Sequence, residues 1–390
     1  MSSAILAPGF VSRFKCLGAD CEDTCCKGWN MQVDSPTRER YRTQAPELLE
    51  SVTGEGDSTI MKRDPKTDYC VKFEGGLCGI QREHGEQFLG DACHFYPRAT
   101  RALGSEVTMT ATLSCPEIAR LSLFEDHTFA DENILADRLP QSLQDYLPEG
   151  LTSAQALAIH RAFMNAALEE GVSPEHSFMR IFTASESLAR ITTSAWPGAV
   201  PFYLQHADTH LPTSDPRATD PVYLLQALCG LVAAAKYVHH VRLMHTIRDM
   251  EHALHVTIRW DTLAIASLPD SAHAAEALYT RWRNEWQATY TPLLKRYLAM
   301  QVSLALFPFA GFGHTLPERA AIIGIRMATV RLGLMSILDA TNGTAGKNDI
   351  VRVVQSLSRF LDHLAGADFS LKIYTETGWL TGSRLRALLS

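Results

Sequence analysis

The sequence has no excess of basic residues that would suit a nucleic-acid partner. Its 36 Lys and Arg residues against 43 Asp and Glu residues give a net charge of −7. A protein that displaces counterions from a phosphate backbone needs a basic surface, and this composition provides no domain-wide basic field. We therefore expect no nucleic-acid partner, whereas a cationic partner suits the charge.

Signals for export and for a membrane span are also missing. The first residues have no basic segment ahead of an apolar run, and Pro8 interrupts the short apolar stretch there. The most apolar later stretch, Val222 to Val238, contains Gln226 and Lys236 and is shorter than the roughly 20 residues that cross a bilayer. The sequence predicts a cytoplasmic protein without a membrane span, in which this stretch is a buried helix.

Cysteine is scarce after residue 115, where Cys229 is the only one of nine. The other eight are Cys16, Cys21, Cys25, Cys26, Cys70, Cys78, Cys93 and Cys115. This asymmetry divides the chain into a Cys-rich metal-binding region at 1–116 and a second region at 117–390. In a reducing compartment, clustered thiols serve as metal ligands more often than they form disulfides.

Local patterns predict a mainly α fold, with a helical body and short β-hairpin elements in the Cys-rich region. Lys72 to Cys78 contains a Gly pair that suits a hairpin, and Ala102 to Ser114 alternates as a half-buried strand does. After residue 117 the period becomes helical, with start signals at Ser153, Ser173-Pro174, Asp220-Pro221, Asp270, Thr291-Pro292, Pro317 and Asn348. The proline-rich segment 196–221 predicts a long irregular connection.

The cysteines before residue 115 form two groups. Cys16-x4-Cys21-x3-Cys25-Cys26 is followed by Cys70-x7-Cys78-x14-Cys93. Thiolates select zinc or an iron–sulfur cluster, and the lack of the Cys-x2-Cys pairs common in zinc sites favours a cluster. One [4Fe–4S] cluster needs four thiolates, so about four of these seven cysteines are expected as metal ligands. Disulfides and buried thiols without a ligand are the alternatives.

Further residues around the cysteines complete a recognisable pattern. Trp29 and Asp34 follow the first group, and Tyr96-Pro97-Arg98 and Leu113-Ser114-Cys115-Pro116-Glu117 follow the second. Two later segments, Tyr297 to Phe309 and Val353 to His363, belong to the same pattern. Over nearly its whole length the chain resembles the flagellin lysine N-methylases, which belong to a wider group with a Cys-rich iron- or zinc-chelating domain.

The resemblance implies transfer of methyl groups from S-adenosylmethionine to lysine side chains of flagellin, with an iron–sulfur cluster required. The usual methyltransferase site is not predicted, because no Gly-x-Gly-x-Gly follows a strand. A radical S-adenosylmethionine motif is also missing, because Cys21-x3-Cys25 is followed by Gly28 where a third cysteine is needed. The cofactor site must be of another kind. A nonenzymatic iron- or zinc-chelating module and an iron–sulfur redox enzyme are the competing functions.

Lysine methylation needs a neutral amine, so the protein must remove a proton from its substrate. Asp34, Tyr96 and Glu117 lie beside motif cysteines and are candidates for the vicinity of that amine. Each also suits a structural role: Asp34 as a helix N-cap, Tyr96 as a packed ring and Glu117 in the first turn of a helix.

An aromatic stripe occurs later in the chain. Trp282 and Trp286 are four residues apart, with Tyr279 and Tyr290 near them. Such a stripe suits the core of a helical body. The alternative is a surface that receives a lysine or a methyl-ammonium group.

Overall fold

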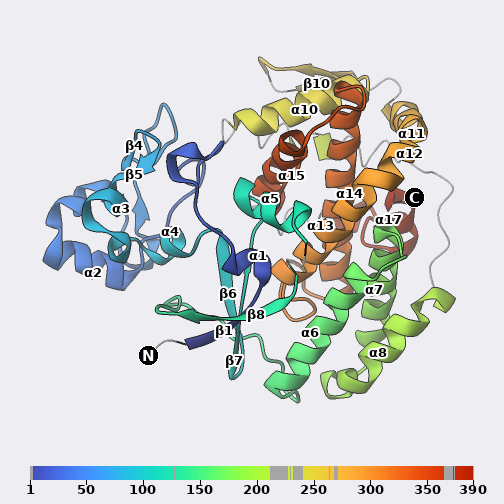
Figure 1. Ribbon diagram of the computed structural model, residues 1–390, viewed down its shortest axis with the longest axis horizontal. Coiled ribbons are helices and arrows are strands. Elements are labelled where there is room, and N and C mark those ends of the chain that lie inside the picture. The colour runs from blue at the N-terminus through green and yellow to red at the C-terminus, as the bar shows by residue number, and fades with distance from the viewer. Residues whose placement is uncertain are drawn as a thin grey trace.

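The computed structural model has the mainly α fold that the sequence predicts. It describes residues 3–126, 129–210, 227–228, 230–231, 240–262, 264–267, 271–363, 372 and 374–389. In Figure 1 the Cys-rich segment lies on the left, the helices fill the right side, and a small sheet lies below and between them.

The Cys-rich segment is built from short elements. Its helices are α2 (Ser35–Gln44), α3 (Gly79–His84) and α4 (Asp91–Phe95), and its strand pairs are β2 (Val52–Thr53) with β3 (Ile60–Met61) and β4 (Phe73–Glu74) with β5 (Leu77–Cys78). The predicted hairpin is confirmed at β4 and β5. Gly75 and Gly76 form its turn with φ angles of 58° and 84°, which glycine adopts without steric cost.

A four-stranded sheet connects this segment to the helices. Its order is β6 (Arg98–Leu103), β7 (Glu106–Ala111), β1 (Ser3–Pro8) and β8 (Asp131–Ala136). β1 runs parallel to β7, with Leu6 opposite Thr108, and antiparallel to β8. The short helix α1 (Gly9–Ser12) follows β1. The predicted alternating strand is therefore confirmed at β7, although its first residues belong to β6 and to the turn.

The helical body contains α5 (Pro116–Phe124), α6 (Ser153–Leu168), α7 (Pro174–Leu188), α8 (Trp196–His206), α10 (Val241–Ala253), α11 (Ser271–Arg281), α12 (Arg283–Glu285), α13 (Thr291–Leu304), α14 (Leu316–Ala340), α15 (Lys347–Leu361) and α17 (Gly382–Leu389). A two-stranded pair, β9 (Thr257–Arg259) with β10 (Ala264–Ser267), accompanies them. The start signals act as predicted where the structure describes them: the side chain of Ser173 caps α7, and Pro292 lies in the first turn of α13. The signals at Asp220-Pro221 and at Asp270 lie outside the described residues.

Two predicted segments differ from the structure. Residues 196–206 form the helix α8 instead of an irregular connection, because Pro197 lies in its first turn, where a missing N–H costs nothing. The rest of that predicted connection, from residue 211, lies outside the described residues. The helix predicted from Asp270 through Gln287 ends at Arg281, and a π-helical turn follows at Trp286–Tyr290.

Side chains pack into two hydrophobic cores. The smaller core contains residues between Met31 and Leu89 and lies within the Cys-rich segment. The larger core joins the sheet to the helices and includes Ile5 and Leu103 as well as the body. The division of the chain at residue 116 stays a prediction, but the packing places the sheet with the helices.

Helix α14 lies at the centre of the body and packs against α7, α10 and α15. By length and composition it is apolar enough to cross a membrane, with a mean hydropathy of 1.6. However, 89% of that stretch is buried inside the protein, which is typical of a central core helix.

Candidate functional site

Every cysteine in the described part of the chain has a free thiol, but their environments differ. Cys16 is exposed, Cys115 is buried, and the remaining thiols are half-buried. The backbone N–H of Cys70 donates a hydrogen bond of 2.7 Å to the carbonyl of Cys26. This contact places the two predicted groups of cysteines side by side.

The thiols that influence one another form a set that we call the thiol cluster: Cys25, Cys26, Cys70, Cys78 and Cys93. A hydrogen bond from Cys26 lowers the pKa of the Cys25 thiol to about 7, and the same bond raises the pKa of Cys26. Burial raises the pKa of Cys93, and negative charge on neighbouring thiolates raises it further. The thiols can therefore lose their protons together only when a cation lies among them.

The donor chemistry of the thiol cluster fits a soft metal centre. Within the described residues, no group of three or more His, Cys, Asp or Glu side chains is arranged to hold a metal ion. Thiolates are donors for both an iron–sulfur cluster and a zinc ion. The donor set fits either centre, and the iron–sulfur cluster stays a prediction.

Cys16 and Cys21, two of the predicted ligands, lie apart from the thiol cluster in electrostatic terms. Burial raises the pKa of Cys21 to about 11, and the charges that act on it come from Glu22, Asp23 and Cys16. Cys115 precedes α5; burial raises the pKa of its thiol to about 12, and negative charge on Cys21 and Cys25 raises it further. By these mutual electrostatic effects, five of the seven predicted metal ligands form one group, and Cys115 is influenced both by that group and by Cys21.

Asp23 is a carboxylate between two motif cysteines, and it connects their loop to the helical body. Its Oδ2 accepts hydrogen bonds from His240 at 2.9 Å, Gln355 at 2.7 Å and Arg359 at 2.9 Å. Burial by itself would raise the pKa of Asp23, but the His240 hydrogen bond and the Arg359 charge hold that pKa well below its usual range. Asp23 is therefore a buried anion.

His240 faces Asp23 through Nε2. Its Nδ1 accepts a hydrogen bond of 3.2 Å from the backbone N–H of Leu243 and thereby caps α10. An acceptor nitrogen carries no proton, so the ring hydrogen lies on Nε2, the atom that faces Asp23. Arg359 is then the cation that balances the Asp23 carboxylate.

Arg359 holds the cysteine loop through several contacts at once. Besides Asp23, it donates to the carbonyls of Thr24, at 2.8 Å, and of Lys27. Its guanidinium lies over the Trp29 ring, 4.3 Å from the centroid. The arginine comes from α15 and is only 7% exposed, so this helix positions the loop that carries Cys25 and Cys26.

Tyr96 belongs to the same contact region. Its hydroxyl lies 3.1 Å from Ser114 Oγ, which in turn lies 2.9 Å from His363 Nε2. The Trp29 ring packs between Tyr96 and His363, with centroid distances of 5.3 Å and 4.9 Å. Burial raises the pKa of Tyr96 well above its ordinary value, so this hydroxyl stays protonated.

We refer to this contact region as the junction. Its residues are Asp23, Trp29, Tyr96, Ser114, His240, Gln355, Arg359 and His363.

The other two candidate residues, Asp34 and Glu117, have structural partners. Asp34 caps α2 by accepting from the N–H of Thr37 at 2.9 Å, and its second oxygen accepts from the N–H of Asp91 at 2.8 Å. Its predicted N-cap role is confirmed. Glu117 lies in the first turn of α5 and pairs with Arg120. Of the three candidates, only Tyr96 lies in the junction.

The aromatic stripe is part of the core at Trp286. This side chain is 1% exposed and stacks on Tyr290 with a centroid distance of 5.4 Å. Trp282 is half-buried, and its Nε1 donates to Asp339 at 3.0 Å. The core interpretation is therefore correct for Trp286, and the lysine-receiving alternative does not apply to it.

Several junction residues were not predicted from the sequence. Gln355 and Arg359 are four residues apart on one face of α15, and His363 follows just after this helix ends, all inside a segment that carries the resemblance; this spacing is a signal that could have identified them. Asp23 could have been noticed as a carboxylate between two motif thiols. Nothing near His240 in the sequence indicates that it pairs with Asp23, which is 217 residues away.

Comparison with known proteins finds similarity in part of the chain. Proteins named Lysine-N-methylase from Salmonella typhimurium (strain LT2) and Salmonella choleraesuis (strain SC-B67) are 28% and 27% identical to it over 125 residues. Each match covers 29% of this chain and 31% of the relative, so the chain spans about a third of those proteins. The flagellar biosynthetic protein FliU of Salmonella muenchen is 26% identical over 150 residues, which cover 34% of this chain and 88% of FliU. No family model and no solved structure matches.

Proposed function

We propose that this chain is a protein-lysine N-methyltransferase that transfers methyl groups from S-adenosylmethionine to flagellin lysines in the cytoplasm. The observation that carries the proposal is the similarity to two proteins named Lysine-N-methylase. Similarity to a flagellar biosynthetic protein supports flagellin as the substrate. The net charge of −7 suits a partner that presents lysine side chains.

We further propose that the thiol cluster supplies four ligands to one [4Fe–4S] cluster. Cys70, Cys78 and Cys93 are ligands in this proposal, together with Cys25 or Cys26. When bound, the iron–sulfur cluster supplies a redox-active centre whose ligation also stabilises the loops around it. Arg359 binds the loop that contains Cys25 and lies over Trp29, so it would hold this ligand in place.

The residues of the junction suit the handling of a lysine side chain in two ways. The rings of Trp29 and Tyr96 supply an apolar wall along which the carbon chain of a lysine can pack, while the Arg359 guanidinium already lies over the Trp29 ring. A surrounding with little water lowers the pKa of that ammonium, which favours the neutral amine needed for methyl transfer. Tyr96 orients by hydrogen bonding and does not act as a base, because its hydroxyl stays protonated.

The test is a methylation assay with anaerobically prepared protein, flagellin and isotopically labelled S-adenosylmethionine. We expect the label on flagellin lysines, iron in the protein and a broad absorption band near ~400 nm. The Cys93→Ser variant should lose iron and activity together. Cys16→Ser is the matched control and should keep both, because Cys16 is exposed and lies outside the thiol cluster.

Other outcomes of this assay would support the competing functions. Iron or zinc binding without any affinity for S-adenosylmethionine would overturn the methyltransferase proposal and favour a nonenzymatic chelating module. Stoichiometric zinc in colourless protein, after strictly anaerobic preparation, would overturn the iron–sulfur assignment alone.

A further inference from the structure

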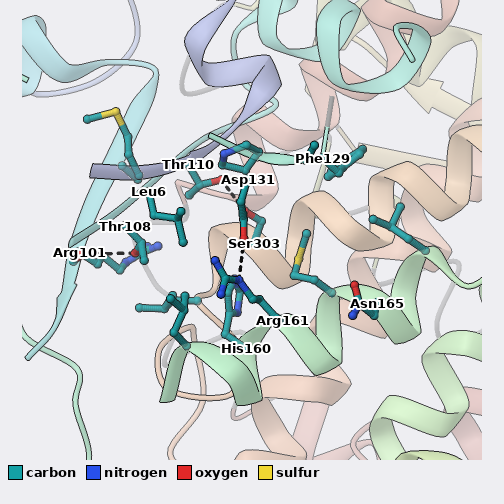
Figure 2. A pocket seen from close by; sticks show the side chains of 18 residues that line it. Leu6, Arg101, Thr108, Thr110, Phe129, Asp131, His160, Arg161, Asn165 and Ser303 are labelled. Atoms are coloured by element: carbon teal, nitrogen blue, oxygen red, sulfur yellow. Dashed lines mark hydrogen bonds and ion pairs between the residues drawn. The ribbon is translucent and has the colours of Figure 1, made fainter. Parts of the chain in front are cut away.

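A cavity lies between the sheet and the helical body, away from the thiol cluster. It has a volume of about 270 Å³ and is bounded by β1, β6 and β7 on one side and by α6 and α13 on the other. Ligand pockets usually measure roughly 300–1,000 Å³, so this space suits a small molecule or one end of a larger one. Figure 2 shows side chains from both sides directed into it.

The cavity contains a cation without an acidic partner. Arg101 of β6 lines the space, and its Nη1 donates to the backbone carbonyl of Leu304. No carboxylate within the described part of the chain forms an ion pair with it; its other partner is Tyr146, through a side-chain hydrogen bond and with the ring centroid at 6.0 Å. Burial lowers the pKa of Arg101, but an arginine stays charged at neutral pH. A half-buried cation of this kind favours an anionic group beside it.

The cavity lining also includes an ion pair, which lies toward solvent and whose two charges balance each other. Arg161 donates to Asp131 at 2.7 Å, and their side chains are 46% and 37% exposed. The pair therefore marks the open side of the cavity, whereas Arg101 supplies the uncompensated charge. An entering molecule would meet a carboxylate at the opening and a guanidinium deeper inside.

His160 offers a hydrogen-bond acceptor to the cavity. Its Nδ1 lies 2.8 Å from the carbonyl of Phe307, and because a carbonyl only accepts, Nδ1 carries the proton. Burial lowers the pKa of His160 and keeps the ring neutral, so Nε2 is left as an acceptor. An ammonium or hydroxyl group of a ligand is the partner that this atom suits.

Hydroxyl and apolar groups complete the lining. Thr110 of β7 and Ser303 of α13 lie 2.7 Å apart and can each donate or accept one more bond. Apolar side chains cover much of the remaining wall: Leu6, Met109, Leu157, Met164, Leu168 and Leu306. The cavity thus presents one cation, one neutral acceptor and apolar surface, which fits a carboxylate and an amino group on a short aliphatic chain.

We propose that this cavity binds the amino-acid end of S-adenosylmethionine, with the carboxylate on Arg101 and the amino group toward His160 Nε2. The inference rests on the proposed function, because that function requires this cofactor. The cavity is too small for the whole cofactor, so the sulfonium and the nucleoside lie toward its open side.

One strand connects this cavity with the junction. Thr108, Met109 and Thr110 of β7 line the cavity, and Thr112, which follows the end of this strand, donates to Asp362 at 3.1 Å and to Ser114. The strand therefore leads from the proposed cofactor cavity toward the junction.

The experiment measures binding by calorimetry, with S-adenosylmethionine and its decarboxylated analogue as probes. We expect the wild-type protein to bind the analogue at least about tenfold more weakly, which is the loss expected for one charge-assisted hydrogen bond. Arg101→Gln should weaken binding of S-adenosylmethionine by a similar factor and leave the analogue unchanged, so that the variant no longer distinguishes the two.

The matched control is Arg319→Gln. Arg319 also donates to backbone carbonyls of the same segment, those of Pro308 and Phe309, but it does not line the cavity. Both affinities should stay at the wild-type value in this variant. A second variant, Ala99→Leu, keeps Arg101 and fills the cavity from β6, so it should weaken binding of both probes. Thermal melting verifies that each variant is folded.

The outcomes separate this inference from the proposed function. If S-adenosylmethionine binds and flagellin is methylated, but folded Arg101→Gln and Ala99→Leu keep wild-type affinity, the cavity assignment is overturned and the function stands. If the wild-type protein binds no S-adenosylmethionine and transfers no methyl group, the function is overturned and the cavity assignment falls with it.

Discussion

At the scale of single residues, the ion pair of Asp23 with Arg359 is the contact whose loss should matter most. Both side chains are nearly buried, at 12% and 7% exposure, and Arg359 also binds the carbonyls of Thr24 and Lys27. Removing one partner of such a pair leaves the other charge in a poorly hydrated place. The ion pair therefore stabilises the protein mainly because loss of either partner would leave an unpaired charge in the interior.

Arg359→Gln should lower the free energy of unfolding by about 3 kcal/mol, the lower end for a broken buried ion pair, because His240 and Gln355 still hydrogen-bond Asp23. Chemical denaturation measures the change. Arg296→Gln is the control, since its ion-pair partner Asp126 is 86% exposed, and its effect should stay within about 0.5 kcal/mol. Equal effects of the two substitutions would contradict the role of Arg359.

The thiols should differ in reactivity when the protein is free of metal. The pKa of Cys25 is lowered to about 7 by the hydrogen bond from Cys26, whereas burial raises the pKa of Cys21 to about 11. Because the thiolate is the reactive form, alkylation of Cys25 should reach half its maximal rate near pH 7, and that of Cys21 should still be slow there. Mass spectrometry of iodoacetamide-treated protein at several pH values measures both rates.

The Cys26→Ala variant tests whether the hydrogen bond from Cys26 is what lowers the pKa of Cys25. Without the Cys26 donor, the pKa of Cys25 should rise, and its alkylation at pH 7 should become slower. An unchanged rate would show that another group, such as Arg359, activates this thiol.

At the scale of secondary-structure elements, the close approach of α14 to α7 depends on one glycine. A Cβ atom placed on Gly324 would come within 2.3 Å of the Phe178 ring, which is fully buried. The ring has no free space into which it can move without disturbing α7. The contact therefore requires glycine in the middle of a helix, despite its low helix propensity.

Gly324→Ala should destabilise the protein by about 1–3 kcal/mol, the usual cost of overpacking a core. Gly198→Ala is the control because α8 has no atom within 4 Å of the added methyl group, and alanine there should be neutral or stabilising. Thermal melting of both variants measures the difference. A stabilised Gly324→Ala variant would mean that α14 and α7 separate easily.

Many of the helices could be predicted from the sequence, because the residues that begin a helix are close together in the chain. Ser173 with Pro174 and Thr291 with Pro292 begin helices where their cap chemistry predicts. The same logic failed at 196–206, where prolines were interpreted as breakers although Pro197 lies in the first turn of a helix. The cysteine pattern predicts which thiols belong to the site, but the partners of Asp23 come from distant parts of the chain. No local spacing in the sequence indicates that such distant residues pair with Asp23.

At the scale of the whole molecule, the two hydrophobic cores should respond differently to loss of metal. The smaller core is packed directly against Cys70, Cys78 and Cys93, whereas the larger core includes the sheet and the helices. If those thiols hold a cluster, ligation contributes to the folding free energy of the smaller core.

Removing the metal with a chelator should therefore raise amide hydrogen exchange mainly between residues 16 and 97, and the helices α13 and α14 should stay protected. Hydrogen-exchange mass spectrometry with and without chelator measures this pattern. Because Arg359 binds the cysteine loop, α15 is the part of the body where a smaller increase is expected. Uniform loss of protection across the chain would show that the two cores unfold as one unit.

The position of β1 within the sheet has a consequence for the order of events during synthesis. Of the four strands this one is made first, yet its neighbours, β7 at 106–111 and β8 at 131–136, are made about a hundred residues or more later. Ribosomes add about 5–20 residues per second, so β1 spends several seconds without either partner. During that interval its apolar side chains are available to chaperones, and the sheet can close only after residue 136 has left the ribosomal tunnel.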